Sequence, residues 1–190
     1  MSTETLNLPD VPDLTGIGDE TTQLEPFIDG LYKAVIQEKR VFTDKNGNDR
    51  VFESGDNPSA AGDSRNIKLQ IQVTRQSDGR QLNVSHLVNY RPDDLTPEAV
   101  KAVKVQQELV KEGTAEWGST FRTFATLQRL GTLQRVAGVR QLQKNGNGGL
   151  DLTPVYSKEC YVQLKDDDRN PQYKMIKQIR PIENKPKFVL

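Results

Sequence analysis

The sequence predicts a mainly β protein of the α+β class, in which five strands are interrupted by a helical insertion. Three observations predict it. Apolar and polar residues alternate in three segments before residue 91, helical periodicity replaces this alternation over about 95–143, and alternation returns in two segments after residue 154. A chain of 190 residues with 34% hydrophobic and 27% charged residues suits one domain with a tail.

The first predicted strand covers residues 30–42, where apolar side chains at Tyr32, Ala34 and Ile36 share one face. A polar stretch with turn signals follows over 43–65. Within it, we expect the short run 50–52 to extend a hairpin away from the body of the protein.

The second and third strands cover residues 66–75 and 81–90, where the alternation is strict. The four residues 76–79, ending in Gly79, make a tight turn between them. These two strands are therefore expected to form an antiparallel hairpin.

The helical insertion begins where Thr96 can cap a helix and Pro97 can occupy its first turn, and this helix should run to about Lys111. A second helix follows Thr120, with apolar residues at spacings of three. Gly131 interrupts this second pattern and indicates a break.

The last two strands are predicted at residues 155–164 and 172–182, joined by an acidic turn. In the final strand Met175, Ile176 and Ile179 depart from strict alternation, which indicates a β-bulge. This order of elements, with a helical insertion between the third and fourth strands, is that of an OB-fold. An OB-fold is a five-stranded barrel whose strand 2–3 face and loops bind single-stranded nucleic acids and oligosaccharides. We expect an OB-fold-like barrel over 27–183, between a flexible acidic arm at 1–26 and a basic tail at 184–190.

Charge is sorted along the chain, although the formal net charge is zero. Residues 1–29 hold seven acidic residues and no Lys or Arg, so the remainder carries 26 basic against 19 acidic residues. Residues 117–150 contain five basic residues and no acidic one. Such a one-signed stretch indicates a polyanion or an acidic partner surface nearby, and the acidic arm is one candidate.

Several classes of protein are excluded or disfavoured. No stretch approaches the roughly 18 apolar residues of a membrane span, and no signal peptide begins the chain, so we expect a soluble intracellular protein without a membrane partner. Cys160 is the single cysteine, which excludes an intrachain disulfide and a cysteine-based zinc site. We expect it to be a core residue.

Catalytic signals are weak, and the chain is expected not to be an enzyme and to need no cofactor or metal. His86, the single histidine, lies on the apolar face of a predicted strand and is expected to be a core or rim residue. Asp166, Asp167 and Asp168 could bind a divalent ion, but a solvated turn is the preferred interpretation. The spacing of Glu183 and Lys185 occurs in some metal-dependent nucleases, which leaves a nuclease as a distant alternative.

Nucleic-acid binding is better supported, because proteins that bind single strands combine a cationic groove with aromatic rings on which bases stack. Basic and aromatic residues interleave along the predicted strands in this way. The alternative is an ordinary polar strand face, with Phe42 and Tyr90 capping a barrel end. The predicted binding residues are Lys33, Lys39, Arg40, Phe42, Arg50, Phe52, Lys68, Arg75, Tyr90, Arg91, Lys158 and Tyr161.

The succession GLYKAVIQEKRVF, RNIKLQIQVTR, RQLNVSHLVNY, FRTFATLQRLG and YVQLKDDDRNPQYKMIKQIRPI resembles bacteriophage-encoded OB-fold single-stranded-DNA-binding proteins over about 27–182. The resemblance implies a non-enzymatic protein that coats single-stranded DNA during replication or recombination, in the cytoplasm of a bacterial host, and that can form homo-oligomers. Many such proteins recruit partners through an acidic C-terminal tail.

The C-terminus of this chain is basic, and its acidic segment lies at the other end. By analogy the arm would contact replication or recombination proteins, or would compete with DNA for the cationic groove. The alternative function is a protein-interaction or virion structural module, in which the arm and the one-signed helix dock between subunits.

Overall fold

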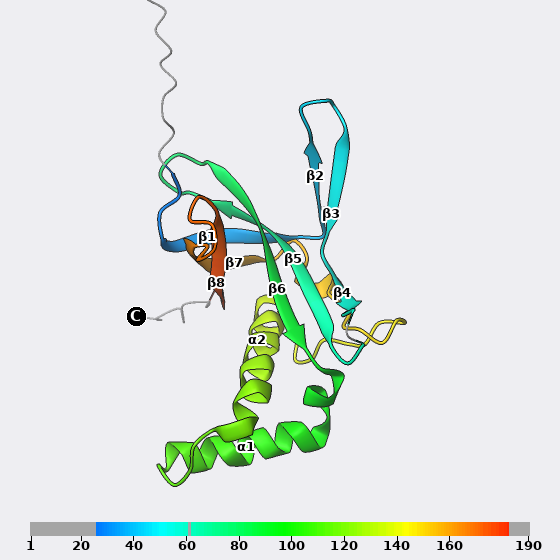
Figure 1. The fold of residues 1–190 in the computed structure, drawn as a ribbon, viewed down its shortest axis with the longest axis vertical. Coiled ribbons are helices and arrows are strands. Elements are labelled where there is room, and N and C mark those ends of the chain that lie inside the picture. The colour runs from blue at the N-terminus through cyan, green and yellow to red at the C-terminus, as the bar shows by residue number, and fades with distance from the viewer. Residues whose placement is uncertain (1–25, 61, 183–190) are drawn as a thin grey trace, which may run out of the picture.

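A computed structural model describes residues 26–60 and 62–182. Its main feature is a curled antiparallel half-barrel of five strands with two inserted helices (Figure 1). The strands lie in the order β6–β5–β1–β7–β8, and a short β4 (Gly55–Pro58) pairs beside the first residues of β5. The five long strands are β1 (Gly30–Gln37), β5 (Arg65–Thr74), β6 (Gln81–Tyr90), β7 (Glu159–Asp166) and β8 (Lys174–Pro181). The predicted α+β class is confirmed.

The predicted five-stranded barrel is present only as a half-barrel, because its sheet does not close. Within the described ranges, no ladder of backbone hydrogen bonds joins the edge strands β6 and β8. The side chain of His86 on β6 instead lies close to the backbone of Ile176 on β8. Helix α2 (Phe121–Ala137) packs against both strands and contributes Leu130 and Leu133 to the core. The apolar side chains of α2 therefore fill the space between β6 and β8, which a closed barrel would not leave open.

The core follows from the alternation in β5. Ile67, Leu69, Ile71 and Val73 are at most 1% exposed, and they pack with the inward-facing residues of the other strands. Cys160 on β7 belongs to the same core, as expected for a packing residue. The outer face of the half-barrel is consequently the polar one.

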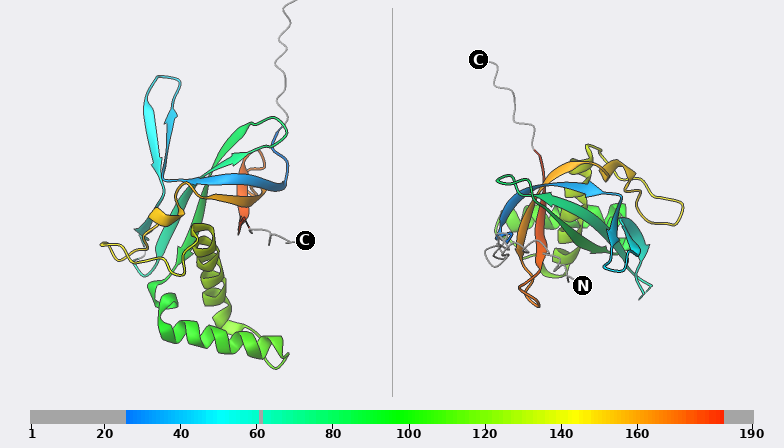
Figure 2. Two further views of the ribbon diagram at one scale, coloured as in Figure 1. Left: turned by 180° about the vertical axis from the view of Figure 1, so that it is seen from behind. Right: turned by 90° about the horizontal axis from the view of Figure 1, so that it is seen from above.

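The predicted first strand divides at Glu38 into β1 and β2 (Lys39–Thr43). The hydroxyl of Ser54 donates to the Gln37 carbonyl at 2.5 Å, and the Ser54 amide donates to the Glu38 carbonyl at 2.7 Å. Beyond this point β2 pairs only with β3 (Asp49–Glu53), and the two form a hairpin that projects from the sheet (Figure 2). The predicted projecting hairpin is confirmed.

Helix α1 (Pro97–Lys111) has the predicted bounds, and the Thr96 hydroxyl accepts a hydrogen bond from the Ala99 amide at 3.2 Å. Short 3₁₀ helices η1 (Pro92–Leu95) and η2 (Gly118–Thr120) precede α1 and α2. Helix α2 continues through Gly131, so the predicted break is wrong. It ends at Gly138, whose φ of 72° reverses the chain.

The final strands differ slightly from their predicted bounds. A 3₁₀ helix, η3 (Thr153–Val155), occupies the predicted start of the fourth strand, and β7 begins at Glu159. The predicted bulge in β8 is confirmed by a register shift opposite Gln163 and Leu164. No helix in the described residues has the length and apolar character needed to cross a membrane. Residues 1–25 of the predicted arm at 1–26, the Glu183 and Lys185 pair and the tail at 184–190 lie outside the described residues.

Candidate nucleic-acid interface

The projecting hairpin carries four of the predicted binding residues on one face, which we call the hairpin face: Arg40, Phe42, Arg50 and Phe52. Arg40 is paired with Phe52 across the two strands, and Phe42 with Arg50. Directly opposed residues share a face, and so do residues two apart in one strand. Each ring therefore has an arginine directly across and another beside it. Phe42 is 54% exposed.

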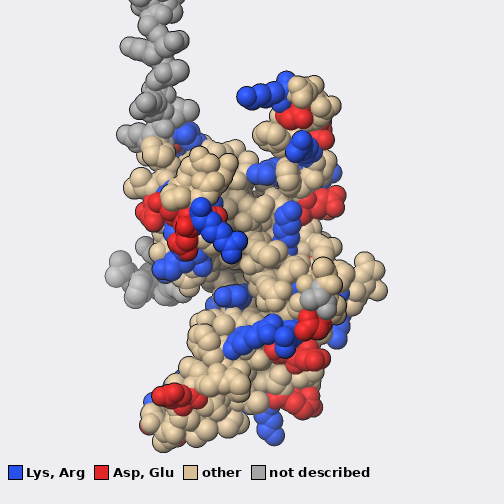
Figure 3. Space-filling model, viewed as in Figure 1, with Lys and Arg blue, Asp and Glu red and all other residues tan. Residues whose placement is uncertain are grey.

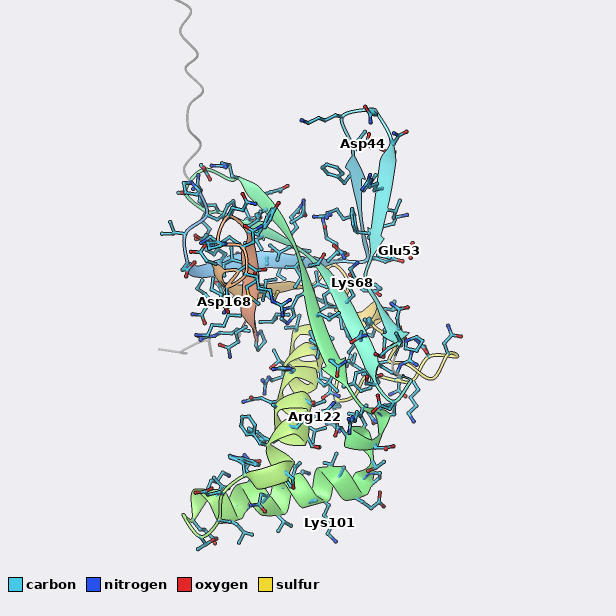
Figure 4. The ribbon with its side chains drawn as sticks, viewed as in Figure 1. Asp44, Glu53, Lys68, Lys101, Arg122 and Asp168 are labelled. Atoms are coloured by element: carbon cyan, nitrogen blue, oxygen red, sulfur yellow. The ribbon has the colours of Figure 1, made fainter. Side chains whose placement is uncertain are left out.

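The foot of the hairpin face lies against the outer face of the sheet. The Arg40 guanidinium lies 4.7 Å from the centroid of the Phe52 ring, and the Lys68 ammonium on β5 lies 5.7 Å from it. Arg40 also donates a hydrogen bond of 3.4 Å to the Asn83 carbonyl on β6. Figure 4 shows Lys68 on the sheet below the hairpin. The hairpin face is thus directed toward the outer surface of β5 and β6.

A buried polar cluster anchors this foot. Gln70 is 1% exposed, its backbone amide donates to the Ser54 hydroxyl at 2.8 Å, and its side-chain carbonyl accepts from the Ser85 hydroxyl at 3.0 Å. Gln37 lies opposite Gln70 in the β1–β5 ladder. Ser54 is hydrogen-bonded to both β1 and β5, and these bonds fix the direction in which the hairpin leaves the sheet.

A second group of predicted residues lies on the outer face of β1 and β7. Lys33 is opposite Tyr161, which is in turn opposite Arg180 on β8. Lys33 is four residues from the end of β1 and so about 13 Å from the foot of the hairpin. It forms a 2.7 Å ion pair with Glu159, while Lys158 is exposed just before β7. Tyr161 faces away from the core, as predicted.

Tyr90 does not belong to an exposed surface, so the prediction that it stacks bases is wrong. It is 1% exposed, and its hydroxyl donates to the Asp56 carboxylate at 2.5 Å. Burial and the nearby carboxylate raise the pKa of Tyr90. Its ring is part of the core.

Three other predicted cations lie apart from the hairpin face. Arg75 is at one end of the β5–β6 hairpin, where it pairs with Asp78 and its guanidinium lies 5.5 Å from the centroid of the Phe27 ring. Arg91 is at the other end and pairs with Asp63 at 3.4 Å. Lys39 lies on the opposite face of the projecting hairpin, across from Glu53.

The structure also shows a basic groove that was not among the predicted sites. It lies along the open edge between β6 and β8, above α2, and has a volume of about 530 Å³. We call it the seam groove; its charged or titratable lining residues are His86, Arg129, Arg135, Lys165 and Lys177. Figure 3 shows basic side chains along the projecting hairpin and a hollow where the sheet meets the helices. The stretch 117–150, which has only basic charges, supplies Arg129 and Arg135 to this groove. The sequence therefore indicated a basic surface, but only the structure shows where the groove lies.

His86 is half-buried at the edge of this groove, as expected for a rim residue. Burial lowers its pKa, and the positive charge of Arg129 acts in the same direction. The acidic turn is occupied by ion pairs, since Asp166 pairs with Lys174 and Asp168 with Lys165. No group of three or more His, Cys, Asp or Glu residues suited to a metal ion occurs in the described part of the chain.

No protein-family model and no curated protein matches the sequence.

Proposed function

We propose that this protein binds single-stranded DNA without strong sequence preference and without catalysing a reaction, on an OB-fold-like half-barrel. The observation that carries the proposal is the hairpin face. There each of two phenylalanines lies opposite an arginine of the neighbouring strand, above the sheet. Every base has a π-face, so rings of this kind bind single strands of any sequence.

The position of the hairpin supports the proposal. It connects the first and second long strands of the half-barrel, and in OB-folds this loop and the strand 2–3 face bind single strands. In this chain the corresponding face is that of β5 and β6, toward which the hairpin face is directed. A protein that coats strands during phage replication or recombination would need this sequence tolerance.

The roles of the side chains follow from their geometry. Phe42 and Phe52 would stack on bases, and Tyr161 would offer a further ring on the same outer face. The phosphates would be met by Arg40, Arg50, Lys68, Lys33 and Lys158. Arg40 and Lys68 lie over the Phe52 ring, so a strand that reaches this ring would meet two cations next to it.

The test is fluorescence anisotropy with labelled oligo-dT. Phe42→Ala should weaken binding by about 5- to 150-fold, because stacking contributes about 1–3 kcal/mol per base. Phe42→Trp should retain it. Val41→Ala is the matched control, since Val41 is as exposed as Phe42 but lies on the opposite face of the hairpin. Absence of binding at low salt, or equal affinity of the Phe42→Ala and Val41→Ala variants, would overturn the proposal.

A protein-interaction or virion assembly role is the second candidate, and one observation favours it. Helices α1 and α2 and the loop after α2 line a groove of about 870 Å³ in which apolar residues are mixed with polar ones, and elsewhere on α1 Val105 is 55% exposed. If this groove holds a protein partner or a second copy, Val100→Ser should dissociate the assembly in sedimentation velocity while oligo-dT affinity stays unchanged. A monomeric wild-type protein with no partner would argue against it.

A further inference from the structure

The seam groove exists because the half-barrel is open. Among the described residues no backbone ladder joins β6 and β8; the His86 side chain of β6 lies beside Ile176 of β8, and α2 packs against both strands. The floor is apolar, with Val88, Leu133 and Ile179, and its walls carry the charges. A groove of this composition suits an amphipathic ligand that has both flat or apolar parts and negative charges.

The charges of the seam groove have one sign. Arg129 and Arg135 come from α2, Lys165 from β7 and Lys177 from β8, and no Asp or Glu in the described part of the chain lines the groove. Lys165 pairs with Asp168, whose side chain is 82% exposed, and Arg135 donates to the Thr132 hydroxyl at 3.1 Å. Cations that line one groove raise the local positive potential and favour an anion there.

The seam groove adjoins the part of the sheet that lies below the hairpin face. Lys68, whose ammonium lies over Phe52, is directly opposite Leu87 in the β5–β6 ladder. Leu87 is 59% exposed and is itself a wall of the seam groove. A single cross-strand pair, whose Cα atoms lie about 5 Å apart, therefore joins the two surfaces.

We propose that the seam groove binds the phosphodiester backbone of the same single strand that stacks on the hairpin face. The strand would pass from Phe52 over Lys68 and Leu87 and enter the groove, where Arg129, Arg135 and Lys177 contact phosphates. This inference rests on the proposed function and extends it, because it makes the binding path longer than the hairpin and gives the one-signed helix α2 a role.

The first test compares oligo-dT of about 4 and about 16 nucleotides, the range of sites that OB-folds cover. In the Arg129→Gln/Lys177→Gln variant, the slope of log affinity against log salt for the longer oligonucleotide should become shallower by about 1.4, since each phosphate contact on a single strand contributes about 0.7. The shorter oligonucleotide should bind as in wild type. An Arg129→Lys/Lys177→Arg variant should restore the slope.

The matched control removes two positive charges elsewhere on the helices. Lys101→Gln/Arg122→Gln alters one exposed residue on α1 and one at the start of α2, neither of which lines the seam groove (Figure 4). This control should leave the salt slope of the longer oligonucleotide unchanged. An equal loss of slope in both double variants would show an effect of net charge alone and would overturn the inference.

The second test uses His86 as a reporter, because it is the only histidine of the chain. Its imidazole NMR signals should shift when the longer oligonucleotide is added and stay in place with the shorter one. If Phe42→Ala weakens binding but the seam variant does not and the His86 signals stay in place, this inference fails and the proposed function stands. If the wild type binds neither oligonucleotide, the proposed function fails.

Discussion

Asp56 illustrates how a single buried residue determines what its neighbours can do. Its side chain is fully buried, and its carboxylate accepts hydrogen bonds from Arg65 Nε at 3.0 Å, the Tyr90 hydroxyl at 2.5 Å and the Leu150 amide at 2.6 Å. It thereby joins β4, β5, β6 and the loop after α2. A side chain at Gly149 would meet this cluster, since its Cβ would lie 3.0 Å from the carboxylate. The sequence gives no local sign of this role.

Asp56→Ala should therefore destabilise the fold by about 3–5 kcal/mol, because it leaves the largely buried Arg65 guanidinium without its partner. Asp63→Ala is the control, since Asp63 and Arg91 form an exposed pair worth about 0–1 kcal/mol. Urea unfolding followed by circular dichroism measures both. Similar unfolding free energies for the two variants would contradict the assigned role of Asp56.

His86 makes stability depend on pH. Its pKa is lowered in the folded protein, so the fold favours the neutral imidazole, whereas the unfolded chain has the ordinary value of about 6.5. The His86 contribution is full above pH 6.5 and is lost progressively as the pH falls below 6.5 toward the folded pKa. The slope for one proton cannot exceed about 1.4 kcal/mol per pH unit. Urea midpoints between about pH 7.5 and 5.5 should fall in wild type and change less in His86→Gln.

At the scale of elements, the strands with one fully buried face were predicted well and those without it were not. The inner face of β5 enters the core along its whole length, and that of β6 does so at Val84, Val88 and Tyr90, so the alternation in both strands is strict. The break between β1 and β2 depends on hydrogen bonds from Ser54, 16 residues after Glu38, which no local pattern shows. The hairpin face likewise could not be predicted without the strand register, which places Arg40 opposite Phe52.

Gly131 is a position in a helix where the local sequence pattern likewise predicts the wrong structure. It favours a break locally, but Leu130 and Leu133 are buried on either side of it, and their packing outweighs the cost of about 1 kcal/mol for glycine in a helix. A Cβ at Gly131 would meet no atom within 4 Å. Gly131→Ala should therefore raise the unfolding free energy by about 1 kcal/mol.

Gly138→Ala is the matched control for that prediction. A Cβ there also meets no atom within 4 Å, but the φ of 72° strains any other residue, so this variant should be less stable than wild type. Thermal unfolding of the two alanine variants separates the effects. A stabilised Gly138→Ala variant would contradict the backbone conformation at the end of α2.

Helix α1 should open more readily than the rest of the insertion. Val103 is its only buried residue among 15, whereas α2 has five. Helices with few buried contacts exchange their amide hydrogens through local opening of low free energy. Hydrogen exchange followed by mass spectrometry should show faster exchange in α1 than in α2 and β5, and equal protection of both helices would indicate that α1 has a covering partner in solution.

For the whole molecule, the distribution of charge along the chain affects the approach of a polyanion more than the net charge does. The neutral total combines an acidic N-terminal segment with a basic body, and Asp29, the last acidic residue of that segment, pairs with Lys174 of β8 at 2.7 Å. Lys174 also pairs with Asp166, and these carboxylates raise its pKa. The Asp29 ion pair therefore places the start of the described chain beside β8, which borders the seam groove, and we predict that the acidic residues before it oppose an approaching polyanion.

Deletion of residues 1–25 removes six acidic residues and no basic one, so it should raise the affinity for oligo-dT several-fold at low salt. The gain should shrink between about 50 and about 200 mM salt, as screening reduces the field of the arm at the groove. A full-length variant with the six residues changed to Asn and Gln separates charge from bulk. It should match the deletion if the arm acts through its charge, whereas wild-type affinity in this variant together with a gain on deletion would mean that the arm obstructs the surface sterically. Unchanged affinity in both would exclude competition between the arm and the strand.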